Sequence, residues 1–253
     1  VSGRGGWRDT DVELRGPVVN DIVLRYFELM DYHRGQIGDV ATRARWNPPQ
    51  GPAGKARVRF VWNQPLVDGS RRIEGMYTSL INATPRGGSV RAETAYFAPG
   101  GELRRALRAA LERGVRLTVL TNSEETNDIT VIAEASRGAF YALLKVDPSA
   151  ALLERRSRPD LGEHTLHSKI ASFGTHGPVI IGSSNLDSWS MTHNSECAAL
   201  IDDPDLRAAF DRMFARDIAP DRADRITKEL VETEPAWARI RQWAVANLIA
   251  YWG

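Results

Sequence analysis

The sequence predicts an α/β fold, and two observations carry that prediction. From Val58 onward, short runs rich in β-branched and aromatic residues alternate with longer segments that have apolar residues at helical spacing. This alternation is typical of a layered α/β domain. The chain has 253 residues, of which 42% are hydrophobic, so it can bury a full core as one large domain or two small ones.

The N-terminal part predicts a strand, a helix and a linker. Val12–Arg15 alternates apolar and charged residues, which indicates a short strand. A helix then starts at Gly16-Pro17, because proline is favoured at the first helical position, and its apolar stripe runs to Met30. Residues 33–57 are rich in Gly, Pro, Arg and Lys without periodicity, and we expect a linker or a long surface loop there.

The alternating part predicts the following elements in chain order. We expect strands at Arg57–Trp62, Ser89–Phe97, Val115–Thr121, Ala151–Leu153, Ile170–Phe173, Val179–Ile181 and Glu196–Leu200. We expect helices over Arg71–Asn82, Gly101–Arg113, Asp128–Lys145, Asp203–Phe214 and Ala223–Glu234. Pro235–Gly253 carries a wide apolar stripe with Trp237, Trp243 and Trp252. Such a helix either docks on the core or lies in a membrane interface, where tryptophan is favoured.

Charge and cysteine content narrow the function classes. The net charge is +1 and the pI about 8.1, so no bulk field points to nucleic acid as the partner. The single cysteine, Cys197, excludes an intrachain disulfide. No run is long and apolar enough to predict a membrane span. The chain begins Val1-Ser2-Gly3, without an initiating methionine or signal-peptide pattern, and this beginning is typical of the middle of a protein.

Chemistry-bearing residues concentrate between His167 and Glu196. In an extended segment His167 and Lys169 project from the same face, so both side chains can address one ligand. A turn at Gly182–Asn185 adds hydroxyl and amide donors, and Glu196 adds a carboxylate. A His-x-Lys pair or a Gly-Ser-Ser-Asn turn alone is ordinary. Their combination between apolar strands indicates a phosphate-handling site with one nucleophile, one cation, neutral donors and one acid.

In this order the residues resemble the second signature of the phospholipase D superfamily, H-x-K-x4-D-x6-G-S-x-N. The matching positions are His167, Lys169, Gly182, Ser183 and Asn185. Two departures are visible. Gly174 stands where the signature has aspartate, and the gap to the Gly-Ser pair is one residue longer than usual. Glu196 has the place of the glutamate that follows this signature in the family.

Three further runs resemble bacterial cardiolipin synthases. Residues 7–19 resemble the segment that follows the first signature. Tyr96–Gly100 and Leu120–Ser123 resemble runs of one branch and end predicted strands, where open α/β sheets bind ligands. The resemblance thus implies a substrate pocket that includes Tyr96 and Asn122. Ordinary turn and capping chemistry explains these two runs equally well.

The resemblance implies an architecture: a mixed β-sheet sandwiched between helices, as the second half of a pseudo-twofold duplicated fold. Residues 1–56 are then the tail of the first repeat plus a linker. Residues 57–253 are the second repeat with a C-terminal amphipathic helix. The corresponding location is bacterial, either membrane-associated, in the cell envelope or secreted.

The resemblance also implies a mechanism without cofactor or metal. His167, Lys169 and Glu196 are its catalytic residues, while Lys169, Ser183 and Asn185 bind the substrate phosphate. His167 attacks to form a phosphohistidine, and Glu196 fixes its tautomer. A second histidine must protonate the leaving alkoxide. The only histidine before residue 160 is His33, followed by Arg34-Gly35. The second H-x-K is therefore expected from an N-terminal fragment or from another copy of the chain in a homodimer.

Three functions remain open at this level. The first is a cardiolipin synthase-like phosphatidyltransferase or phosphodiesterase that acts on phospholipid at a membrane surface. The second is a phospholipase D-type nuclease that works as a homodimer, against which the near-neutral charge and the lack of a basic-aromatic stripe argue. The third is a non-catalytic binding protein, which the glycine at position 174 suggests.

Overall fold

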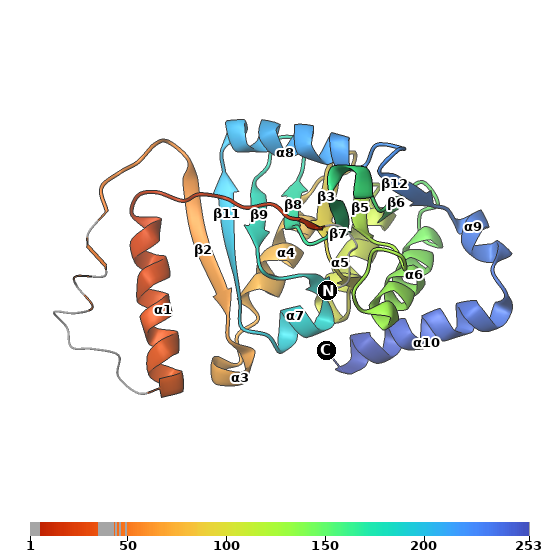
Figure 1. The fold of residues 1–253 in the computed structure, drawn as a ribbon, viewed down its shortest axis with the longest axis horizontal. Coiled ribbons are helices and arrows are strands. Elements are labelled where there is room, and N and C mark those ends of the chain that lie inside the picture. The colour runs from red at the N-terminus through yellow and green to blue at the C-terminus, as the bar shows by residue number, and fades with distance from the viewer. Residues whose placement is uncertain (1–5, 35–42, 44, 46, 49, 253) are drawn as a thin grey trace.

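An eight-stranded mixed sheet forms the centre of the molecule, in the order β12-β6-β5-β3-β8-β9-β11-β2 (Figure 1). The computed structural model describes residues 6–34, 43, 45, 47–48 and 50–252. The strands of this sheet are β2 (Arg57–Asn63), β3 (Ser89–Thr94), β5 (Arg116–Asn122), β6 (Ala151–Arg155), β8 (Lys169–Phe173), β9 (Val179–Gly182), β11 (Glu196–Asp202) and β12 (Ala223–Ile226). β3, β5 and β6 are parallel, and the other neighbours pair antiparallel.

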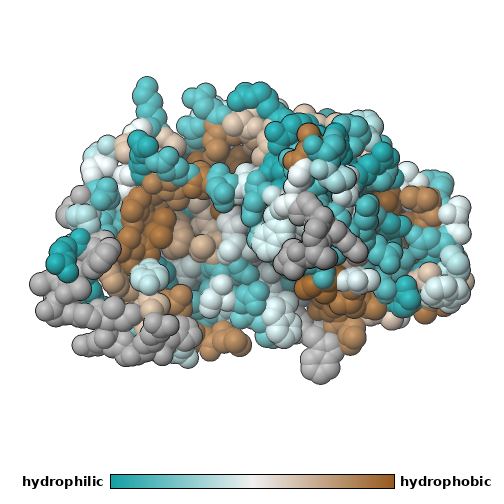
Figure 2. Space-filling view, in the orientation of Figure 1, coloured by the Kyte–Doolittle hydropathy of each residue, from teal (hydrophilic) through white to brown (hydrophobic). Residues whose placement is uncertain are grey.

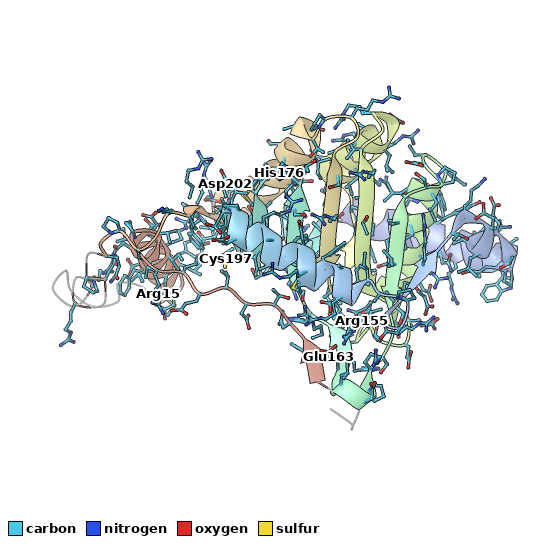
Figure 3. All side chains as sticks on the ribbon, turned by 90° about the horizontal axis from the view of Figure 1, so that it is seen from above. Arg15, Arg155, Glu163, His176, Cys197 and Asp202 are labelled. Carbon is cyan, nitrogen blue, oxygen red and sulfur yellow. The ribbon has the colours of Figure 1, made fainter. Side chains whose placement is uncertain are left out.

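Helices cover both faces of the sheet, as the view from above shows (Figure 3). One face carries α4 (Arg72–Ala83), α5 (Gly101–Glu112) and α6 (Thr130–Leu144), whose apolar sides form one core cluster with the sheet. The other face carries α8 (Pro204–Asp217), where Phe210 and Phe214 pack against β8, β9 and β11. The prediction of an α/β fold with a mixed sheet between helices is confirmed.

Two further long helices, α1 and α10, and several shorter elements surround the sheet. They are β1 (Gly6–Arg8), α1 (Val18–Arg34), α3 (Pro65–Asp68), β4 (Phe97–Ala98), η1 (Pro159–Leu161), β7 (Glu163–Leu166), β10 (Leu186–Asp187), α7 (Ser188–Thr192), α9 (Lys228–Thr233) and α10 (Ala236–Trp252). α10 lies closely on α6, since a Cβ added at Gly138 would lie 2.4 Å from the Gln242 carbonyl oxygen. None of the helices that the structure describes is long and apolar enough to cross a membrane.

Two predicted elements are wrong. Val12–Arg15 is not a strand; the strand of this region is β1, which pairs with β7. The predicted helix Ala223–Glu234 is the strand β12 followed by α9. The Thr227 side chain accepts from the Leu230 N–H and starts the helix there, and a four-residue strand is too short to show a period. Part of the predicted linker lies outside the described residues, namely residues 35–42, 44, 46 and 49 and the side chain of His33.

Strand direction brings the predicted site residues to one edge of the sheet. β3, β5 and β9 end there, and β8 and β11 begin there. We call this edge the signature edge; its residues are Thr94–Tyr96, Asn122, His167–Lys169, Ser183–Asn185 and Glu196. Open α/β sheets bind ligands at the carboxyl ends of their parallel strands, and the signature edge has that position.

Candidate active site

His167 is fixed by residues from the start of the described chain, Trp7 and Arg8. β1 runs parallel to β7, and the His167 N–H donates to the Arg8 carbonyl at 2.8 Å. The Trp7 indole stacks on the imidazole with ring centroids 4.3 Å apart. Arg8 in turn donates to the Asp217 carboxylate on α8 at 2.5 Å, in a buried pair. These contacts fix both the backbone and the ring of His167.

Asp9 lies against the imidazole, with 2.7 Å between its Oδ2 and His167 Nδ1. Partial burial opposes ionisation of Asp9. The hydrogen bonds from His167 and the Thr10 N–H outweigh it and hold the pKa of Asp9 below its ordinary value. A carboxylate only accepts, so we assign the proton to Nδ1 from this hydrogen bond. The lone pair then lies on Nε2, the atom that can attack.

Lys169 begins β8 and is largely buried, with 8% of its surface exposed. Its Nζ donates to the His167 carbonyl at 2.5 Å. Burial lowers the pKa of Lys169, and the carboxylates of Asp9 and Glu196 partly oppose that shift. A cation in such a position is weakly solvated, so it interacts strongly with an anionic ligand.

Sheet register places the predicted phosphate ligands beside Lys169. Ile170 pairs with Ile181, so the next position along sets Lys169 opposite Gly182, just before Ser183. Thr94 on β3 is the partner of Lys169; its hydroxyl donates to the Tyr96 carbonyl at 2.9 Å and lies 3.4 Å from Asn185 Oδ1. Among the described residues no hydrogen bond of the Asn185 Nδ2 is found, which leaves this donor for a ligand.

Among the described residues Glu196 forms no hydrogen bond or ion pair with His167, which the predicted tautomer-fixing role would require. Its carboxylate accepts from the Ser183 hydroxyl and, at 3.1 Å, from Asn194 Nδ2. Asp9 is the carboxylate on His167 instead. Sequence reasoning missed Asp9 because nothing in the run Trp7-Arg8-Asp9 encodes which later residue it meets.

Of the two expected pocket residues, Tyr96 lies at the surface of the signature edge and Asn122 beneath it. The half-buried Tyr96 donates from its hydroxyl to Asp128 at 2.7 Å. Asn122 is fully buried, and its amide bonds the Leu166 N–H and the carbonyls of Ala95 and Leu166 at 2.8–3.0 Å. Asn122 therefore holds the segment before His167 in place and does not line a pocket.

Gly174 and the extra residue lie at the opposite end of β8 from His167. Five strand residues separate the two ends, about 16 Å at 3.3 Å per residue. Gly174 adopts φ +64°, and its carbonyl accepts from Arg207 at 2.8 Å, as does that of Gly177. The missing aspartate therefore removes no group from the signature edge.

The other described histidines have different surroundings. His164 Nδ1 lies 2.7 Å from the Ser157 hydroxyl. His193 stacks on Trp189 with ring centroids 4.4 Å apart. His176 belongs to the turn between β8 and β9, far from the labelled Arg155–Glu163 pair (Figure 3). Among the described residues, no group of three or more His, Cys, Asp or Glu side chains is placed to hold a metal ion.

An apolar cavity of about 250 Å³ adjoins the signature edge, between α1 and the ends of β2 and β11. Ser183 and Glu196 form its polar end. The remaining surface is largely apolar, from Ile22, Tyr26, Leu29, Phe60 and Trp62, and Arg25, Asn63, Gln64 and Ser195 also line the cavity. Apolar surface is visible between α1 and β2 in Figure 2. The site thus offers an apolar compartment next to its polar groups.

Comparisons with known proteins agree with this geometry. Residues 77–218 match the family model described as cardiolipin synthase, PLD-like domain. Cardiolipin synthase B of Shigella flexneri is 32% identical over 203 residues, which are 78% of this chain and 44% of the relative. Cardiolipin synthase 1 of Staphylococcus epidermidis is 25% identical over 251 residues, 97% of this chain and 47% of the relative. The chain thus spans about half the length of the curated relatives it matches.

Two solved structures share the fold. The phospholipase D family member Nuc from Salmonella typhimurium has a TM-score of 0.51 at 20% identity, covering 68% of this chain and 99% of Nuc. Phosphatidylserine synthase from Haemophilus influenzae has a TM-score of 0.60 at 13% identity, covering 77% of this chain and 47% of the synthase. With the family match over more than half of its length, the chain belongs to the cardiolipin synthase PLD-like domain family of the phospholipase D superfamily.

Proposed function

We propose that the chain provides one half of an active site for phosphatidyl transfer between phospholipid alcohols, with water as a competing acceptor. The observation that carries this proposal is the Asp9–His167 contact of 2.7 Å, which leaves His167 Nε2 as a free nucleophile at the signature edge. Residues 1–56 and 57–253 then serve as the end of a first repeat and as the second repeat.

The reaction proceeds in two displacements at phosphorus. His167 Nε2 attacks the phosphodiester, and the phosphorus–oxygen bond to the leaving alcohol breaks as the alkoxide takes a proton from a second histidine. Lys169 neutralises the phosphoryl oxygens, while the Asn185 amide donates to them. The acceptor hydroxyl then gives its proton to the second histidine and attacks the phosphohistidine, which releases His167. Asp9 stabilises the positive charge on the phosphorylated ring.

The second histidine belongs, in this proposal, to the H-x-K of a first signature. It comes from an upstream segment of a longer protein or from another chain. Glu196 lies at the signature edge without a hydrogen bond to His167, and its two oxygens accept from Ser183 and Asn194. Each carboxylate oxygen can accept a second bond, and in this proposal Glu196 orients the incoming ring as Asp9 orients His167.

The apolar cavity favours a lipid over the alternatives. The surface of its wall comes mostly from aliphatic and aromatic side chains, which suit the hydrocarbon part of a phospholipid. Arg25, the cation of that wall, is already bonded to Gln64 and Glu28. A net charge of +1 also supplies little of the phosphate attraction that nucleases use. The non-catalytic alternative was suggested by the glycine at position 174, and Gly174 lies at the opposite end of β8 from His167, which argues against it.

The test is phosphatidyl transfer with the first signature supplied in the same preparation. We expect His167→Ala to abolish transfer while the circular dichroism spectrum stays unchanged. The matched control is His176→Ala, which changes a histidine at the opposite end of β8 and is expected to keep full activity. Transfer at the wild-type rate in His167→Ala would end this assignment, and nicking of plasmid DNA without lipid transfer would favour the nuclease.

A further inference from the structure

The last helix has two different faces. Ala238 and Ala246 are buried. Ala246 packs against Ala135 of α6, with Val245 and Ile249 beside it. The opposite side, which we call the α10 outer face, consists of Trp237, Ile240, Trp243 and Leu248, each 57–65% exposed. The sequence left open whether this helix docks on the core or meets a membrane. In the structure the inner face packs on the protein, and the large apolar side chains of the α10 outer face are exposed to solvent.

The C-terminal end of α10 lies near the signature edge. The C-terminal half of α10 packs against α7 and β4, and Ala250 lies against Gly100, where an added Cβ would come within 2.9 Å of the Ala250 carbonyl oxygen. Trp189 on α7 adds another exposed aromatic ring at 54% exposure. Figure 2 shows apolar surface at the lower edge, where α10 approaches α7 in Figure 1. Apolar surface thus continues from α10 to the rim of the site.

Basic side chains flank the α10 outer face. Trp243 forms one wall of a hollow of about 530 Å³ that also contains Arg108, Lys145 and Arg239. Glu112 also lines the hollow and pairs with Arg108. Lys145 lies over the Tyr141 ring, 4.3 Å from its centroid, and neither Lys145 nor Arg239 has an ion pair among the described residues. Lys145 and Arg239 thus place positive charge next to the exposed Trp243. At the surface of an anionic bilayer, tryptophan rings lie at the level of the headgroups and cations attract the lipid phosphates.

We propose that the α10 outer face is a docking surface for an anionic phospholipid bilayer, with α10 lying in the plane of the interface. The inference rests on the proposed function in one respect: a phospholipid phosphate reaches the signature edge only if that edge faces the headgroups. The face flanking the edge then meets the bilayer first. Helices that lie in interfaces combine tryptophan and aliphatic residues with neighbouring cations in this way.

The experiment is co-sedimentation of the whole chain with vesicles, which needs no catalysis. Vesicles of phosphatidylcholine with phosphatidylglycerol are compared with vesicles of phosphatidylcholine alone. We expect binding to the anionic vesicles and about a tenfold or greater loss of it in the double variant Trp237→Ser/Trp243→Ser. Tenfold corresponds to about 1.4 kcal/mol, roughly the value of burying one large apolar side chain. All changed positions are exposed, so the fold is expected to survive.

The matched control is Leu24→Ser, which removes a side chain of similar exposure (54%) from α1, at the other end of the molecule (Figure 1). It is expected to bind like the wild type. Equal binding by the double variant, or no binding by the wild type, would overturn the proposal. Concentration-dependent self-association that the double variant abolishes would overturn it in favour of a second copy as occupant. Phosphatidyl transfer on detergent-solubilised lipid without vesicle binding would refute the docking surface and leave the proposed function standing. Vesicle binding without phosphatidyl transfer would refute only the proposed function.

Discussion

Replacing Asp9 by asparagine removes the carboxylate charge that faces His167 Nδ1 and keeps the size of the side chain. Hydrogen bonds to charged groups contribute about 1.5–3 kcal/mol. Here His167 and Asp9 are 35% and 40% exposed, so solvent screening reduces the value to about 1–2 kcal/mol. Since each 1.4 kcal/mol is tenfold in rate, we expect Asp9→Asn to slow formation of the phosphohistidine by about 5- to 30-fold. The neighbouring exposed acid supplies the control, Asp11→Asn, with no expected effect.

The same substitution has a readout in the isolated chain. Nitrogen-15 correlation spectra of histidine rings separate the two neutral tautomers. In the wild type we expect His167 to carry its proton on Nδ1, because Asp9 accepts there, and in Asp9→Ala to shift toward the Nε2–H form that free imidazole prefers. A His167 ring that is protonated on Nε2 in the wild type, or a ring unaffected by Asp9→Ala, would refute the assignment of the nucleophilic nitrogen.

Three further substitutions test the rest of the account. Lys169→Met is expected to weaken the binding of inorganic phosphate at least tenfold by calorimetry. Since burial lowers the pKa of Lys169, wild-type phosphate affinity is expected to fall at a pH below the ordinary lysine value of about 10.4; affinity that is flat up to that pH would contradict this reading. Glu93 is buried between the sheet and α8, where burial raises its pKa to about 8. The folded state then keeps a proton that the unfolded chain loses near pH ~4.3, so stability falls as pH rises between these values, by up to about 1.4 kcal/mol per pH unit. Urea unfolding at several pH values is expected to show a shallower slope in Glu93→Gln, and identical slopes would count against the shift. Gly174→Asp restores the signature residue but adds a side chain at φ +64°; we expect about 1 kcal/mol lower stability and no gain in transfer, whereas a higher melting temperature would show that the turn tolerates aspartate.

Local pattern predicted most of the fold. The apolar spacing of Leu103, Leu107 and Leu111 defined α5, and all three side chains are buried as expected. Short elements escaped prediction, because β12 and β1 have four and three residues and their pairing partners, β6 and β7, supply the reason for their conformation. Such strands are determined by tertiary contacts and leave no periodic signal.

In the candidate site, too, local pattern predicted some features and missed those that depend on tertiary contacts. His167 and Lys169 project together because they are two residues apart, and their register with Gly182 follows from adjacent antiparallel strands. Asp9 reaches His167 only because Arg8 is held by Asp217 and β1 pairs with β7. That long-range constraint is invisible in the run Trp7-Arg8-Asp9. Asn122 is a residue for which the local pattern suggested too much. Its place at a strand end suggested substrate contact, but its amide hydrogen-bonds the backbone N–H and carbonyl of Leu166.

The most direct test of the central claim is to trap the covalent intermediate. The whole protein, with the first signature supplied, is mixed with phosphatidylglycerol, quenched in mildly alkaline solution, where phosphohistidine persists, and digested for mass spectrometry. The account predicts a phosphatidyl adduct on His167 that acid removes, and no adduct in His167→Ala. Turnover with the adduct on another residue, or turnover that survives in His167→Ala, would contradict the claim that His167 is the nucleophile.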